Sequence, residues 1–216
     1  MRLRTGIAVV AVMALASCAG DGTPSTASTD PSTSAALASA SAEPVGPERL
    51  PSGKDLMEVT AGPYLTPDGF APELRLDIPG GWTSVHRAAD AFDLGMPDPD
   101  RDAPLLAVVF MTPAEGNAAD ALAAVEQRAT GRVRAVRASI GPIKAKAIDV
   151  TGGRGELVAS AARGIALDAA PGQRVRVLAA DVDGAPLVVV VLVPDGDGWA
   201  TGWAAARELL DGVSGA

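Results

Sequence analysis

The sequence has few of the side chains on which most enzymes and metal sites depend. Its 216 residues include one cysteine and one histidine, and aromatic residues make up 3% of the chain. A single histidine cannot form a His-x-x-x-His zinc site, and a single cysteine cannot form an intrachain disulfide or a cysteine-based zinc site. The glycine-rich segment Gly152–Gly155 lacks the third glycine of a dinucleotide-binding loop and the Gly-Lys-Ser/Thr of a P-loop. The sequence therefore predicts no cofactor and no metal ion, and a plain turn at this segment.

Basic residues are outnumbered as well. The chain has 18 lysines and arginines against 26 aspartates and glutamates, a formal net charge of −8. Because nucleic-acid binding depends on clustered Lys and Arg that contact phosphates, this balance argues against a nucleic-acid partner. The apolar stretches Gly6–Ala16 and Leu187–Val193 hold 11 and 7 residues. Both are too short for a membrane helix, which needs about 20 residues.

The N-terminus has the layout of a secretory signal. A basic start, Met1–Arg4, precedes the uncharged apolar run Gly6–Ala16, and small residues follow. This order of basic, apolar and small residues is typical of a cleaved signal peptide. We therefore expect residues 1–17 to form the signal peptide and to be absent from the mature protein.

The string Leu15-Ala16-Ser17-Cys18 resembles the lipobox of bacterial lipoproteins at all four positions. The resemblance implies that a diacylglycerol is attached to Cys18 through a thioether and that cleavage occurs just before it, which suits the nucleophilic thiolate of cysteine. The protein would then be anchored on the extracytoplasmic face of the cell membrane. The alternatives are an ordinary signal peptide with a chance cysteine and a cytosolic helix. The abundance of Ala, Val, Gly, Asp and Arg suggests an actinobacterial source of high GC content.

Composition divides the rest of the chain into three parts. Residues 18–51 are rich in Ser, Thr, Ala and Pro, a composition that cannot bury enough apolar surface to order itself. A flexible tether of about 35 residues has an end-to-end distance of about 30–35 Å. Residues 52–72 contain three prolines and are expected to lead into the folded domain, residues 73–216.

The folded part alternates between strand and helix patterns. Alternation of apolar and polar residues, or a continuous apolar run, indicates a strand, and apolar residues spaced by three and four indicate a helix. Asn117 suits the N-cap of a helix, Gly131 its C-terminal end, and Asp183-Gly184 a type I′ hairpin turn. The predicted strands are 74–78, 82–88, 92–94, 105–111, two within 133–150 on either side of Gly141-Pro142, 158–167, 174–182 and 187–193, with a loop at 97–104 and helices at 117–130 and 199–210.

This order predicts an α+β fold, an antiparallel sheet meander with two packing helices. It resembles the PsbP-like α/β/α sandwich from Glu73 to Val213. The matching pieces are the strand-Pro-Gly-Gly-Trp segment at 74–82, the apolar strand at 105–111 with its following helix, and the closing strand-Asp-Gly-strand-helix at 174–212. The resemblance implies the architecture and a tendency toward accessory, non-catalytic roles, but no site residue.

His86, the only histidine, lies two residues after Ser84. On a regular strand both side chains would share one face, which leaves open an envelope hydrolase that uses this pair. The sequence contains no Gly-x-Ser-x-Gly nucleophile elbow, so a packed or surface histidine is the favoured interpretation and no catalytic residue is predicted.

Two acidic segments have the spacing of a calcium-loop start. Asp98-Pro-Asp100-Arg-Asp102 continues with Ala103 where an EF-hand needs Gly and Val109 where it needs Glu. We expect a solvated acidic loop, with a weak calcium site of another kind as the alternative. Asp195-Gly-Asp197 is expected to be a turn that begins a helix.

Six basic residues follow one another without an intervening acid: Arg128, Arg132, Arg134, Arg137, Lys144 and Lys146. Such a group could contact anionic lipid headgroups or an acidic wall polymer; the alternative is a solvated helix end and strand face. Trp199 and Trp203, one helical turn apart, suit the core better than a ligand pocket.

Together these features favour a non-catalytic binding or accessory domain that acts on an envelope partner. One alternative is a lipoprotein that binds a small apolar ligand in a cavity lined by Leu122, Val189 and Trp199. The hydrolase that uses Ser84 and His86 is the other.

Overall fold

The computed structural model describes residues 46–51, 53, 57–88, 90–98, 105–151, 156–158, 166–168 and 172–216, with the backbone alone for residues 57, 84–88, 156–158 and 166–168. The predicted signal peptide, Cys18, most of the tether, the acidic loop after Asp98 and the turn at Gly152–Gly155 lie outside the described residues.

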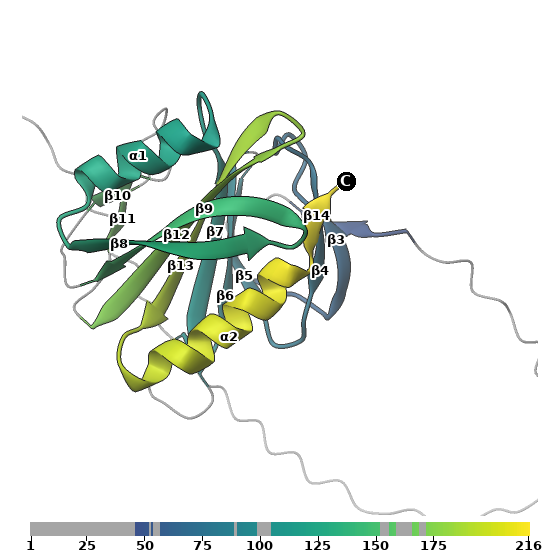
Figure 1. The fold of residues 1–216 in the computed structure, drawn as a ribbon. Coiled ribbons are helices and arrows are strands. Elements are labelled where there is room, and N and C mark those ends of the chain that lie inside the picture. The colour runs from purple at the N-terminus through teal and green to yellow at the C-terminus, as the bar shows by residue number, and fades with distance from the viewer. Residues whose placement is uncertain are drawn as a thin grey trace, which may run out of the picture. The chain divides into compact units, whose positions relative to one another are not determined.

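The described chain has two helices, α1 (Ala118–Arg128) and α2 (Asp197–Asp211). Its strands are β1 (Glu48–Arg49), β2 (Met57–Glu58), β3 (Gly62–Leu65), β4 (Leu74–Ile78), β5 (Thr83–Ala88), β6 (Ala91–Met96), β7 (Ala107–Pro113), β8 (Arg132–Ile140), β9 (Ile143–Thr151), β10 (Glu156–Val158), β11 (Ala166–Asp168), β12 (Gln173–Val182), β13 (Ala185–Pro194) and β14 (Val213–Gly215) (Figure 1).

Eight strands form the main antiparallel sheet, in the order β2-β5-β6-β7-β13-β12-β9-β8. The chain runs β5-β6-β7, passes through α1 to the far edge at β8, and then returns through β9 and β12 to β13, which pairs with β7. The sheet is therefore two antiparallel runs joined at β7 and β13, and not one continuous meander. Strand β13 is central, as expected, because its run of buried valines needs cover on both faces.

The two helices cover opposite faces of this sheet (Figure 1). Successive side chains of a strand point to opposite faces. Val175 and Val177 of β12 accordingly pack with Leu122 of α1, whereas Leu178 packs in the other cluster with Leu209 of α2. This arrangement confirms the predicted α+β fold, with two helices packed against antiparallel sheets.

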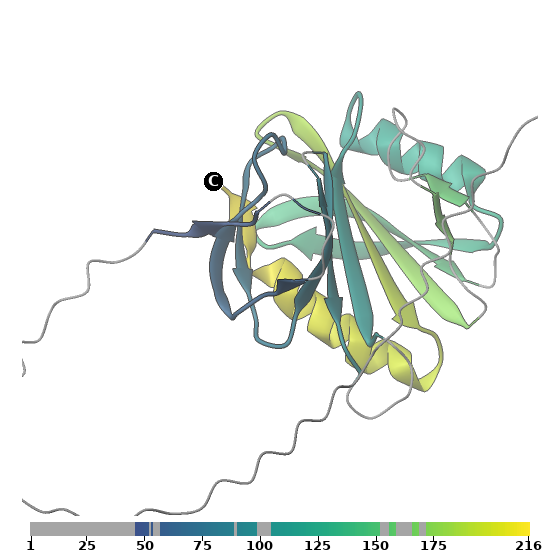
Figure 2. The same cartoon turned by 180° about the vertical axis from the view of Figure 1, so that it is seen from behind.

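A second sheet of four strands, in the order β1-β3-β4-β14, shares the α2 side. Figure 2 shows its first strands close to the C-terminus, because β14 pairs with β4. Leu50 is fully buried in the same core. The folded part thus begins before Glu73, and the expected end of the tether at Pro51 lies too late, because the short β1 pairs in parallel with β3.

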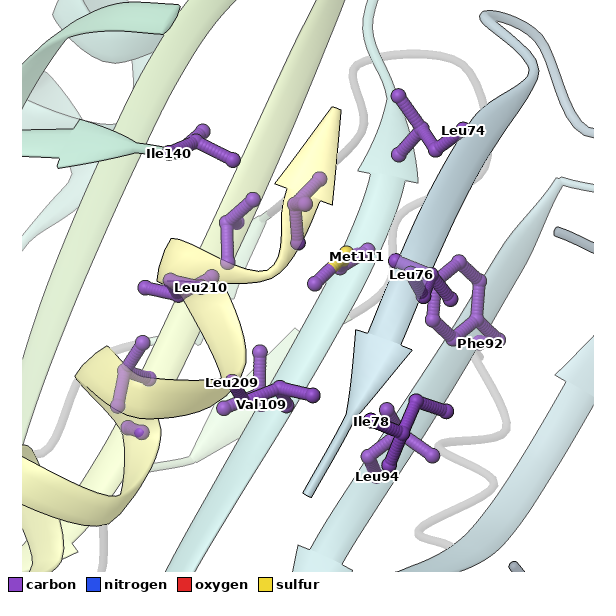
Figure 3. Packing of buried hydrophobic residues seen from close by; sticks show 14 of the residues in the cluster. Leu74, Leu76, Ile78, Phe92, Leu94, Val109, Met111, Ile140, Leu209 and Leu210 are labelled. Carbon is purple, nitrogen blue, oxygen red and sulfur yellow. The ribbon is translucent and has the colours of Figure 1, made fainter. Parts of the chain in front are cut away.

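The core on the α2 side is built from large apolar residues (Figure 3). Side chains of β4 face those of β6 and β7, and the last turn of α2 closes the cluster. The labelled residues are Leu74, Leu76, Ile78, Phe92, Leu94, Val109, Met111, Ile140, Leu209 and Leu210, all at most 1% exposed.

Local sequence signals predict two of the three turns and caps correctly. The Asn117 side chain accepts a hydrogen bond from the backbone N–H of Asp120 at 3.0 Å, which confirms the N-cap of α1. Asp183 and Gly184 both have positive φ, 51° and 81°, as a type I′ turn requires. The expected end at Gly131 was wrong: α1 ends at Arg128, and Ala129 already has extended backbone, so the chain enters β8 without a left-handed residue.

Candidate functional site

Asp149 is the most deeply buried carboxylate among the described residues. It lies on β9 directly opposite Arg176 of β12, and its side chain is 2% exposed. Its Oδ1 accepts a hydrogen bond from Arg176 Nε at 2.6 Å, and its Oδ2 accepts from Arg176 Nη2 at 2.9 Å and from Arg174 Nη2 at 2.7 Å. One carboxylate therefore holds two guanidinium groups in place.

The charges around Asp149 decide its protonation state. Burial by itself would raise the pKa of this carboxyl, but the hydrogen bond and charge of Arg176, and then those of Arg174, together lower it. Asp149 is thus ionised at neutral pH. Because two cations meet one anion, the group keeps an excess positive charge.

Both guanidinium groups also lie on tryptophan rings of α2. The rings of Trp199 and Trp203 are parallel within 3°, with centroids 6.0 Å apart. Arg174 lies 4.1 Å from the centroid of Trp199, and Arg176 lies 4.0 Å from that of Trp203. Cation–π contacts of this kind contribute about 0.5–2 kcal/mol each. The two tryptophans pack against the core, as expected, but are only partly buried, and they also support the arginines. We call Asp149, Arg174, Arg176, Trp199 and Trp203 the arginine–tryptophan site.

Two hollows lie against this site. The first, of about 320 Å³, is lined by Arg137, Ala138, Ser139, Arg176, Trp203 and Arg207. The second, of about 270 Å³, is lined by Arg132, Arg134, Asp149, Thr151, Arg174 and Asp195. Together they gather six of the nine arginines whose side chains the structure describes, against two aspartates. In an acidic protein this is a strong local excess of positive charge.

The six basic residues noted in the sequence do not share one surface. Arg134 pairs directly with Asp149, so it points to the α2 face, whereas Arg137 pairs with Lys146. Lys144 and Lys146 line a third hollow of about 610 Å³ beside Leu122 and Glu126 of α1. Arg137, on the edge strand β8, lines hollows on both sides. Alternation along β8 and β9 thus divides these residues between two faces of the sheet; their contact with anionic lipid stays a prediction.

The only histidine of the chain lies in the main sheet, close to Ser84 in the sequence. Ser84 and His86 both lie on β5, but the pairing with β6 shifts between them, so the regular strand on which their common face depended is interrupted.

Leu122 packs on the α1 face, whereas Val189 and Trp199 belong to the α2-side cluster. Because the sheet separates them, these three residues do not line one cavity.

Two aspartates with the spacing of a calcium-loop start lie at the beginning of α2. Asp195 precedes α2 and Asp197 is its first residue, which confirms the expected turn and helix start. In the part of the chain that the structure describes, no three His, Cys, Asp or Glu side chains gather closely enough to hold a metal ion. Within the same residues, neither helix has both the length and the apolar character needed to cross a bilayer.

Sequence reasoning missed the role of Asp149, Arg174 and Arg176. The available signal was a charged residue at a strand position flanked by buried aliphatics, Ile148 and Val150 for the aspartate and Val175 and Val177 for Arg176. Such a residue needs a partner on a neighbouring strand, but a single sequence does not give the register that identifies it.

Comparison with known proteins gave distant structural similarities alone. No known family and no curated protein matches the chain. A solved structure from Bacteroides thetaiotaomicron has a TM-score of 0.45 and 13% identity over 73% of this chain and 49% of that one. The chain thus spans about half the length of that protein. LpqN of Mycobacterium tuberculosis, described as involved in cell envelope biogenesis, has a TM-score of 0.30 and 15% identity over 74% of this chain and 90% of its own.

Proposed function

We propose that this chain is a membrane-anchored bacterial lipoprotein whose domain binds an anionic component on the extracytoplasmic side of the membrane, without chemical change to it. The anchor rests on the lipobox resemblance around Cys18, and the non-catalytic character on the PsbP-like order of elements. The observation that carries the binding role is the gathering of six arginines around two hollows of an acidic protein.

The chemistry of the site supports binding over catalysis. Arginine remains protonated in proteins, so it donates hydrogen bonds but cannot act as a general base. Both oxygens of Asp149 already accept hydrogen bonds from arginines, so this carboxylate is occupied as well. A surface of this kind can hold carboxylates or phosphates through charge-assisted hydrogen bonds.

Binding can be tested on the full chain with Cys18→Ser, which removes the thiol needed for an anchor. The protein is mixed with phosphatidylcholine vesicles, with vesicles of equal parts phosphatidylcholine and phosphatidylglycerol, and with an acidic polysaccharide. We expect binding to at least one of the anionic materials, weakening as salt rises because salt screens exposed charges. Failure to bind either anionic material at low salt would overturn the proposal.

The anchor has its own test. Wild-type protein expressed in a bacterial host is expected to partition into detergent and to remain with the membrane, because a diacylglycerol buries many methylene groups. The Cys18→Ser variant is expected to lose this partition. Equal partition of the two proteins would show that Cys18 carries no lipid.

A further inference from the structure

The first hollow collects cations from three separate elements. Arg137 comes from the edge strand β8, Arg176 from β12 and Arg207 from α2. The other lining residues are Ala138, Ser139 and Trp203. No carboxylate belongs to this lining, in contrast to the second hollow, where Asp149 and Asp195 do. Of these two hollows, the first therefore has the less compensated positive charge.

The three guanidinium groups have donors to spare. Asp149 engages Nε and Nη2 of Arg176, which fixes the group, and no described residue accepts a hydrogen bond from its Nη1. The side chain of Arg137 forms no hydrogen bond or ion pair with a described residue. Arg207 has one ion pair, with Asp211 at 3.7 Å, and both side chains are more than half exposed, a kind of pair that is weak.

The geometry points to a phosphate ester as the ligand of the first hollow, with its phosphate group held by Arg137, Arg176 and Arg207. A phosphate monoester presents three non-bridging oxygens against the two of a carboxylate, and a phosphate diester presents two together with its weaker bridging oxygens. Either can therefore accept hydrogen bonds from guanidinium groups that approach from different elements. This inference rests on the proposed function, since it names the ligand class of the same face.

The size of the hollow limits the rest of the ligand. Its volume of about 320 Å³ lies at the low end of the range of about 300–1,000 Å³ for small-molecule sites. This space suits a phosphate with one small attached group, such as a glycerol or a sugar ring, next to the indole of Trp203. The same chemistry occurs in a phospholipid headgroup and in a soluble or polymer-bound glycerol phosphate.

The decisive experiment compares two double variants of the full Cys18→Ser chain by calorimetric titration with inorganic phosphate and with glycerol phosphate, at constant ionic strength set with chloride. The test variant is Arg137→Gln/Arg207→Gln. The matched control is Arg75→Gln/Arg128→Gln, which removes the same charge from exposed positions outside the first hollow. Of the six basic residues noted in the sequence, Arg128 is the one that lines none of the three hollows described above. Arg176 is left intact, because its loss would strand Asp149.

We expect the test variant to bind both ligands about tenfold more weakly or worse, since charge-assisted hydrogen bonds are lost, and the control to bind like the parent chain. Both variants should unfold at the same urea concentration as the parent. Absence of phosphate binding in the parent, or an equal loss in both variants, would overturn the inference.

A second experiment, with vesicles, distinguishes the two possible sources of the phosphate. Binding to phosphatidylglycerol vesicles that glycerol phosphate competes away supports a lipid headgroup, whereas saturable binding of glycerol phosphate without vesicle binding supports a soluble or polymer-bound ester. If the parent chain binds anionic vesicles or polysaccharide but both double variants lose the same amount of phosphate binding, the first hollow is not the phosphate site. The proposed function then stands. If no anionic material binds the parent chain, the proposed function itself fails.

Discussion

The two ends of helix α2 are held in place in two very different ways. Near the last turn of α2, Leu209 and Leu210 pack against fully buried aliphatic side chains of β4 and β7 (Figure 3). Near its first turns, Trp199 and Trp203 meet two arginines that surround a buried aspartate. One end of the helix is thus held by an apolar core and the other by an ionic cluster.

The difference between the two ends separates the part of α2 that stabilises the fold from the part to which we assign the proposed binding. Burying apolar surface contributes about 25 cal/mol per Å², so the apolar end stabilises the fold directly. Burying charges has a desolvation cost that often equals or exceeds the attraction between them. An ionic cluster at an otherwise well-packed helix is therefore better explained by the charge that it presents to a ligand than by the stability it adds.

The largest effect is expected where the ionic end loses its single anion. Asp149→Ala leaves Arg174 and Arg176 partly buried without their carboxylate, and breaking a buried pair in this way costs about 3–5 kcal/mol. Urea unfolding measures the loss. Asp195→Ala is the matched control, because this exposed aspartate lines the second hollow and forms no ion pair with a described side chain. It should change stability by about 0.5 kcal/mol or less. Similar losses in both variants would contradict the assigned role of Asp149.

A comparable loss is expected at the apolar end. Leu76 on β4 is fully buried, and Leu→Ala substitutions in cores cost about 2–5 kcal/mol through lost burial and the cavity left behind. Unlike Asp149→Ala, the Leu76→Ala variant should bind phosphate as the parent chain does. Weakened binding in a variant that remains folded would mean that the two ends are not independent.

Acid should act on the ionic end alone. The folded-state pKa of Asp149 is lowered, so its contribution to stability is fully present above the unfolded pKa of about 3.9 and is lost as pH falls through the folded value. Urea unfolding from pH 6 downward is expected to show this loss below about pH 4. The loss of stability in acid should be smaller in the Asp149→Asn variant than in the parent chain. If the variant loses as much stability as the parent, other carboxyl groups cause the effect.

The smallest effect is expected on the opposite face of the sheet. Asn117→Ala removes the cap that satisfies the backbone N–H of Asp120, which costs about 1 kcal/mol. Asn117→Asp is the matched control, because aspartate caps a helix equally well. Phosphate binding should not change in either variant, since α1 lies on the other side of the sheet from the arginine–tryptophan site.

Elements with a local signal could be predicted from the sequence. The cap at Asn117, the turn at Asp183-Gly184 and the buried strand at Leu187–Val193 each depend on a few neighbouring residues, and all three are present. The pairing of β13 with β7 could not be predicted. Pairing between strands that are distant in the sequence depends on their register and on which apolar faces must be buried together.

The candidate site shows the same limit. Six basic residues are close in the sequence, but alternation along β8 and β9 sends Arg134 and Lys146 to opposite faces. The arginine–tryptophan site instead joins β9, β12 and α2, whose residues are far apart in the chain. The pairing of Asp149 with Arg176 across β9 and β12 is what identifies its charged residues as one cluster.

The central claim is that the ionic cluster serves binding and not stability, and its replacement by apolar residues tests this directly. The triple variant Asp149→Leu/Arg174→Met/Arg176→Met removes all three charges together, so no charge is left stranded. Urea unfolding and phosphate titration of this variant should show a stability that is unchanged or raised by about 1–4 kcal/mol, together with loss of phosphate binding. A large fall in stability, or phosphate binding as strong as that of the parent chain, would contradict the claim.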